Sequence, residues 1–203
     1  MLQNEKGGFG DNATITLNAG AQSNETLGIH GHYHVECRDK DGNLKWEEEF
    51  PNLVVAAGKQ LLLDTLLRTS GTYTTTGPFL GLTNATLTPA ATDTMTTLVG
   101  GGKEFTNYTV GGSAVRGQAT FAASTSSGTT PSNVTTSTAS AITYTITGAG
   151  GTVYGCFLVL GSGAVSTQGS TAGTLYSEGN FSTAKITTAG DTVAVTYSTT
   201  ATS

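Results

Sequence analysis

The fold is decided by residues 29–50, which read IHGHYHVECRDKDGNLKWEEEF. In the first half, Tyr33, Val35 and Cys37 alternate with polar residues, and successive side chains of a strand point to opposite faces. An Asp-Gly pair at 41–42 supplies a turn that hairpins prefer. The second half returns as a partner strand, so the stretch predicts a β-hairpin with one buried and one polar face.

Outside the hairpin, the pattern predicts one helix and several more strands. We expect the hairpin to end at Pro51 and a helix to cover residues 53–69, where leucines at 61–63 and 66–67 give a wide apolar face. Residues 153–160 are nearly continuous apolar, which is typical of a central strand covered on both faces. Further strands are expected at 79–83, 118–122, 141–147, 173–181 and 192–198.

Strands at this spacing, with glycine turns between them, indicate a mainly β fold, namely an antiparallel β-sandwich of the jelly-roll or immunoglobulin-like (Ig-like) kind. The chain has 203 residues, which suffices for one core without a disulfide or a metal. We expect a single β-sandwich domain over residues 29–203 that includes the hairpin and the helix. Residues 1–28 are polar and rich in glycine, and we expect an extended N-terminal arm that pairs with its own domain or with a neighbouring subunit.

The composition favours a protein that packs closely against other proteins. Only 11% of residues are charged, against about 25% in ordinary soluble domains, so self-repulsion is weak. The net charge is −5 and no basic stripe occurs, which argues against binding to a nucleic-acid backbone. No apolar run approaches the ~20 residues of a membrane span, and the first residues lack the apolar segment of a secretion signal. We therefore expect synthesis in a reducing cytoplasm, with Cys37 and Cys156 as buried thiols and a disulfide between them as the alternative.

Three histidines raise the question of a metal site. His30, His32 and His34 occupy alternate positions of the first hairpin strand, so they share a face, and Glu36 continues the row. Three imidazoles can ligate a metal, but positions along one strand converge poorly on a single ion. We expect a solvated polar face or a subunit contact, with no metal bound, and a pH-sensitive contact is the other alternative.

The sequence offers no catalytic constellation. Glu47, Glu48 and Glu49 are consecutive, so their carboxylates point to alternating faces and we expect a charged surface opposite Arg38 and Lys45. The nucleophile-elbow, phosphate-loop and zinc-protease motifs are absent from the sequence. All three histidines lie within five residues, which leaves none elsewhere to act as a base. We expect no enzyme and no cofactor. Trp46, the one tryptophan, is expected to pack the hairpin onto the helix.

Several segments resemble small virion proteins of tailed bacteriophages. The specific ones are GHYHVECRDKDGNLKWEE at 31–48 and NLVVAAGKQLLLD at 52–64. Shorter pieces that also resemble this group are FLGLT at 79–83, DTM at 93–95 and GTLY at 173–176. The resemblance implies a component of the particle, of the kind called structural or capsid-decoration proteins, and it carries over no catalytic residue.

The expected function is therefore that of a capsid decoration or cement protein. It would bind the major capsid protein on the outer shell, stabilise capsomer contacts and associate with copies of itself as a dimer or trimer. It would be found in the virion after assembly in the bacterial host cytoplasm. The alternatives are a receptor- or glycan-binding module of a tail or head fibre, and a tail tube or adaptor protein.

Overall fold

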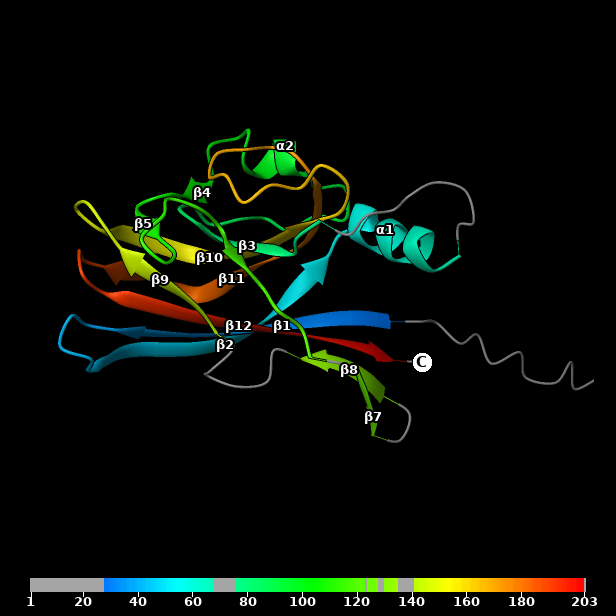
Figure 1. Cartoon of the computed structure of the whole chain (residues 1–203), viewed down its shortest axis with the longest axis horizontal. Helices are drawn as coiled ribbons and strands as arrows, with labels where there is room; N and C mark the ends of the chain where they lie inside the picture. The colour runs from blue at the N-terminus through cyan, green and yellow to red at the C-terminus, as the bar shows by residue number, and fades with distance from the viewer. Residues whose placement is uncertain (1–27, 68–75, 123, 128–129, 135–140, 203) are drawn as a thin grey trace, which may run out of the picture.

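A computed structural model describes residues 28–67, 76–122, 124–127, 130–134 and 141–202 (Figure 1). The arm predicted for residues 1–28 lies outside the described residues, apart from Gly28, which opens the first strand. The elements are β1 (Gly28–Arg38), β2 (Leu44–Val54), α1 (Ala56–Leu67), β3 (Phe79–Thr83), α2 (Met95–Leu98), β4 (Glu104–Phe105), β5 (Tyr108–Thr109), β6 (Gly117–Gln118), β7 (Thr125–Ser127), β8 (Thr130–Val134), β9 (Ile142–Ile146), β10 (Gly151–Leu160), β11 (Thr174–Thr187) and β12 (Thr192–Thr202).

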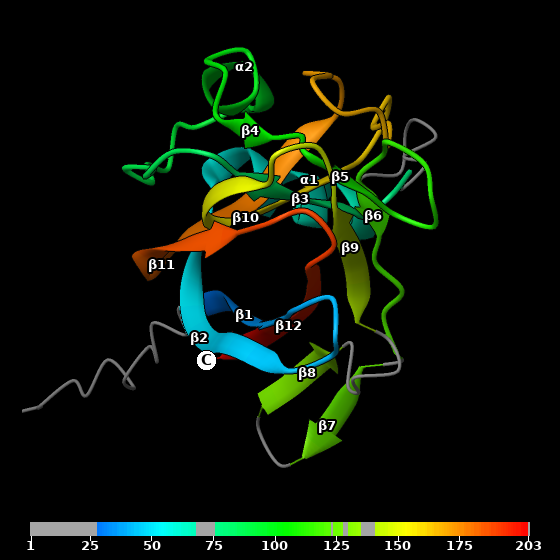
Figure 2. The ribbon, with the colours of Figure 1, turned by 90° about the vertical axis from the view of Figure 1, so that its left-hand side faces the viewer.

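The twelve strands in the described part of the chain form one antiparallel sheet that curls nearly into a barrel (Figure 2). Along its main path the order is β4-β3-β10-β11-β2-β1-β12-β8-β7. Strand β2 joins the two halves, because it pairs with β1 along most of its length and with β11 at Leu53 and Val54. The predicted mainly antiparallel β character is confirmed. The predicted sandwich of two layers is wrong, because the structure is a single curled sheet. The sequence could not show this, since the alternation of apolar and polar residues is the same whether or not one strand pairs with both halves.

The curled sheet has a seam between β6 and β9. Strand β6 pairs with β3, and β9 pairs with β12, but no ladder joins β6 to β9 in the described residues. Their chains still pack tightly, because a Cβ added at Gly117 would lie 2.0 Å from Cγ2 of Ile142. Strands β4 and β5 cross over the seam, since β4 pairs with β3 and β5 pairs with β9.

The hairpin and the helix were predicted with small errors in their boundaries. Strand β2 continues through Pro51 to Val54, instead of ending at Pro51. Pro51 stands where β2 pairs with β1 alone, and a strand tolerates a missing N–H at such a place. Helix α1 therefore begins at Ala56 and ends at Leu67, inside the predicted range of 53–69.

Two apolar clusters flank β10, which confirms its prediction as a strand buried on both faces. One fills the inside of the curled sheet and includes Cys156 and Leu158. The other lies on the outer face beneath α2 and includes Phe157 and Val159. Across the interior, the Tyr33 hydroxyl is 3.1 Å from Oγ of Ser177, which ties β1 to β11.

Both cysteines are buried free thiols, as predicted. Burial raises the pKa of Cys37 to about 12, and it also raises the pKa of Cys156. Trp46 packs at the edge of the interior cluster, with its ring centroid 5.5 Å from that of Phe181 on β11. The prediction that Trp46 packs onto the helix is wrong, because the sheet curls β11 against the hairpin and places α1 at the other end of β2.

Candidate functional site

The histidine row lies on the outer face of β1, as the alternation predicted. Tyr33, Val35 and Cys37 are fully buried on the opposite face. His34 Nε2 lies 2.8 Å from Oε1 of Glu47 on β2. The three histidines do not converge on one point along their strand.

A different group does converge on this face. His34, Glu36 and Glu47 each present one ligand atom, and these atoms lie within 4.8 Å of one another. Glu47 stands directly opposite Glu36 in the β1–β2 register. The sequence showed the row on β1 but missed Glu47, because the register across a hairpin depends on the length and geometry of its turn.

The three consecutive glutamates point to alternating faces, as predicted. Glu48 turns toward β11, where its carboxylate lies 2.6 Å from Nζ of Lys185. On the outer face, Arg38 reaches Glu36 at 3.1 Å, so the expected charged surface includes that cation. Lys45 instead pairs with Asp191 in the turn before β12, and so it does not face the glutamates.

The α1 end of the molecule carries an apolar groove. Gly58 brings the helix against β11, where a Cβ at this position would lie 2.5 Å from the Tyr176 carbonyl oxygen. Beside this contact lies a cavity of about 500 Å³. We call it the α1 groove, and its apolar lining includes Leu61, Leu62, Phe121, Leu158, Leu160, Tyr176 and Tyr197.

Helix α1 also exposes apolar side chains on the side that faces away from the groove. Leu63 is 48% exposed and Leu67 is 74% exposed. They lie four residues apart, so they form one stripe along the helix. A helix that is apolar on several sides is normally buried on several sides, whereas among the described residues β11 and the groove cover one side of α1. The α1 groove and this stripe are therefore two apolar features of one helix.

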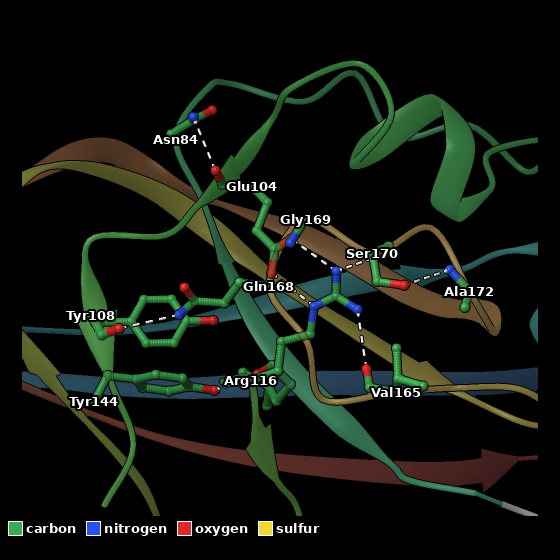
Figure 3. Close-up of polar contacts among 11 residues, drawn as sticks. Asn84, Glu104, Tyr108, Arg116, Tyr144, Val165, Gln168, Gly169, Ser170 and Ala172 are labelled. Atoms are coloured by element: carbon green, nitrogen blue, oxygen red, sulfur yellow. Dashed lines mark hydrogen bonds and ion pairs between the residues drawn. The ribbon is translucent and has the colours of Figure 1, made fainter. Parts of the chain in front are cut away.

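The α2 end is held by a buried ion pair (Figure 3). Arg116 Nε lies 2.7 Å from Oε1 of Glu104, and its Nη2 lies 2.8 Å from Oε2. Arg116 also donates to the Ser170 carbonyl, and the Gly169 N–H donates to Glu104. The guanidinium stands 5.3 Å from the centroid of the Phe157 ring. These bonds join β4, the segment before β6 and the loop at 161–173 into one body.

A second buried acid lies near α2. Glu178 is 2% exposed, and its pKa is raised to about 8, first by burial and then by the neighbouring Asp93. The two carboxyl groups border a cavity of about 60 Å³ that Thr97 and Lys103 also line.

A polar pocket opens beside β4 and β10. It has a volume of about 390 Å³ and is lined by Asn84, Phe105, Thr106, Asn107, Gly151, Thr152 and Tyr154. The amide of Asn84 donates to the Gly102 and Glu104 carbonyls, and the amide of Asn107 donates to the Gly150 carbonyl. The pocket thus has rigid amide walls and one tyrosine ring.

In the described residues, neither helix is long and apolar enough to cross a membrane. The α1 groove, the polar pocket and the Glu104–Arg116 ion pair were not predicted from the sequence, because each is built from segments far apart along the chain.

The chain matches no protein-family model, and neither the curated proteins nor the solved structures contain a match to it.

Proposed function

We propose that this protein is a non-enzymatic structural component of a tailed-phage particle, of the decoration or cement type. It binds the major capsid protein on the outer shell and associates with copies of itself. The low charge, at 11% of residues, and the resemblance of residues 31–64 to small virion proteins support this proposal.

The observation that carries the proposal is the uncovered apolar surface of α1. Leu63 and Leu67 are exposed on one side of α1, and Leu61 and Leu62 on another side line a groove that the chain's described residues leave open. Isolated exposed leucines are ordinary, but an exposed apolar stripe on a helix that also borders an apolar groove marks an interaction site. In a shell, this surface packs against the neighbouring subunit.

The test is an add-back experiment on phage particles made without this protein. We expect these particles to keep their tails and to lose tolerance to heat, and we expect the purified protein to bind them and restore that tolerance. Leu67→Asp should bind poorly, whereas Ile186→Asp should bind normally, because Ile186 is 71% exposed but lies on β11 away from α1. Intact, heat-stable shells that lack tails would overturn the proposal.

A second candidate function, binding of a glycan receptor, rests on the polar pocket. Saccharides are held by amide and hydroxyl groups around an aromatic ring, and Tyr154 with Asn84 and Asn107 supplies these groups. A glycan array with the wild-type protein and with Tyr154→Ala tests it. Saturable binding that the substitution removes would favour a fibre module over a cement protein, and an empty array would remove this candidate.

A further inference from the structure

The outer face of the hairpin brings one imidazole and two carboxylates to a common point. The ligand atoms of His34, Glu36 and Glu47 lie within 4.8 Å of one another. We propose that these three residues bind one divalent transition-metal ion, and that Zn²⁺ fits the site. This site does not depend on the proposed particle function.

The backbone fixes this arrangement before any ion arrives. Glu36 and Glu47 are directly opposed in the ladder between β1 and β2, and His34 lies two residues from Glu36 on the same face. Strand β1 lies inside the sheet, because it also pairs with β12 along its whole length, and Glu47 is fixed by the pairing of β2 with β1. An ion therefore meets ligands whose backbone positions are already set.

Charge also favours a cation at this point. Two carboxylates directly opposite on antiparallel strands repel each other, and such pairs destabilise a sheet. Arg38 offsets part of this repulsion through one oxygen of Glu36, at 3.1 Å. A carboxylate has two oxygens, so Glu36 can keep this ion pair and still offer a ligand atom. Upon binding, the ion replaces the hydrogen bond between His34 and Glu47.

The donor set selects the kind of ion. One imidazole nitrogen with two carboxylate oxygens is a set that Zn²⁺ accepts in tetrahedral geometry. Ca²⁺ and Mg²⁺ prefer oxygen ligands alone, so the imidazole selects against them. Three protein ligands leave one coordination position for water or for a group from another molecule. The side chain of Glu47 is 50% exposed, which leaves that position accessible.

His30 and His32 extend the same row but lie outside the group. His32 lies four residues from Glu36, which is roughly 13–14 Å along a strand, so it cannot reach an ion bound between Glu36 and Glu47 without distortion. His32 faces Pro51 across the hairpin, whereas Glu36 faces Glu47. His32 is therefore a matched control, since it has the same side chain on the same face of the same strand.

The test is calorimetric titration of the full chain, without a polyhistidine tag, with Zn²⁺. We expect one ion per chain, and His34→Ala or Glu47→Gln should each weaken binding at least about tenfold, since ligands and their supports typically carry that much affinity. His32→Ala and Glu49→Gln should change the affinity less than about twofold, as expected for residues that do not ligate. With Co²⁺, the absorption spectrum should be that of a tetrahedral site.

Three results would overturn the proposal. They are the absence of Zn²⁺ binding, binding that survives His34→Ala and is lost with His32→Ala, and equal binding of Ca²⁺. Thermal unfolding measured without metal is the control for the folding of each variant. Neither Glu47→Gln nor Glu49→Gln should lower the unfolding temperature below that of the wild type, so any loss of binding reports the site and not the fold.

Discussion

The region around α2, which we call the α2 end, and the region around α1, the α1 end, differ in the side chains that they bury and expose. At the α2 end, charged groups are buried, and Arg116 and Glu104 satisfy each other in a two-bond ion pair. At the α1 end, apolar groups are exposed, and Leu67 is 74% accessible. The α2 end is therefore completed by the chain's own contacts, whereas the α1 end is suited to contacts with another molecule. Substitutions at the α2 end should change stability, and substitutions at the α1 end should change association.

The largest effect on stability is expected at Arg116. Arg116→Met leaves the Glu104 carboxylate buried without its cation, which should lower the free energy of unfolding by about 3–5 kcal/mol. Urea denaturation measures this loss. Replacing both residues, as in Glu104→Leu with Arg116→Met, should recover part of it, because no unpaired charge remains buried. Lys40→Met is the control, since its pair with Asp41 is exposed, and a loss no larger than the control's would contradict the prediction.

Glu178 should make stability depend on pH. Its pKa is raised from 4.5 in the unfolded chain to about 8, so the folded chain holds a proton that the unfolded chain releases between these values. Stability is therefore full at low pH and falls as pH rises toward 8, by at most about 1.4 kcal/mol per pH unit. The pKa of Asp93 is lowered below 3.8, which places its titration outside this window.

Urea denaturation at pH 5, 6.5 and 8 measures this slope. Glu178→Gln should flatten it, because the amide keeps the shape and the hydrogen-bond donor of the protonated acid without titrating. Glu49→Gln, at an exposed carboxylate, should leave the slope unchanged. Equal slopes for wild type and Glu178→Gln would show that another group controls the pH dependence.

A smaller loss is expected at the start of α2. The Thr94 hydroxyl accepts a hydrogen bond from the Thr97 N–H, and the Thr97 hydroxyl accepts one from the Thr94 N–H. Thr94→Ala removes this cap and should cost about 1 kcal/mol in chemical denaturation. Thr96→Ala, at an exposed position within the same helical turn, should have little effect. A larger loss at Thr96 than at Thr94 would contradict the prediction.

The smallest effect on stability is expected at the α1 end. Leu67→Asp should change the free energy of unfolding by less than about 0.5 kcal/mol, since it alters an exposed side chain. Its self-association, measured by sedimentation, should weaken at least about tenfold, because a charge enters an apolar contact. Ile186→Asp should leave association unchanged, and equal effects of the two variants would remove the distinction between the ends.

The predictable part of this fold is the part encoded by neighbouring residues. The hairpin was predicted because the parity of Tyr33, Val35 and Cys37 and the turn that follows lie within one stretch. Strand β10 was predicted because both of its faces are apolar in sequence. Curling of the sheet was not predicted, because it depends on β2 pairing with β11, whose residues are more than a hundred positions away.

The candidate sites follow the same rule. The histidine row was visible because it lies on one strand, but its relevant partner, Glu47, lies on the next strand and depends on register. The Glu104–Arg116 ion pair was not predicted, because the sequence does not show whether a charged residue is buried. The apolar face of α1 was foreseen as a helix face, whereas its exposure depends on what covers it.

The pairing of β1 with β12 also bears on how the protein is made. Gly28 pairs with Thr202, and the ladder runs to Arg38 opposite Thr192. Strand β1 can pair with β2 early, but its ladder with β12 forms only after the last of these residues has left the ribosome, so the sheet closes only after most of the chain has emerged. Folds with such distant pairings form in roughly milliseconds to seconds, and their waiting strand edges are prone to aggregation. In a cell that makes many copies at once, protection of the nascent hairpin should therefore raise the yield of folded protein.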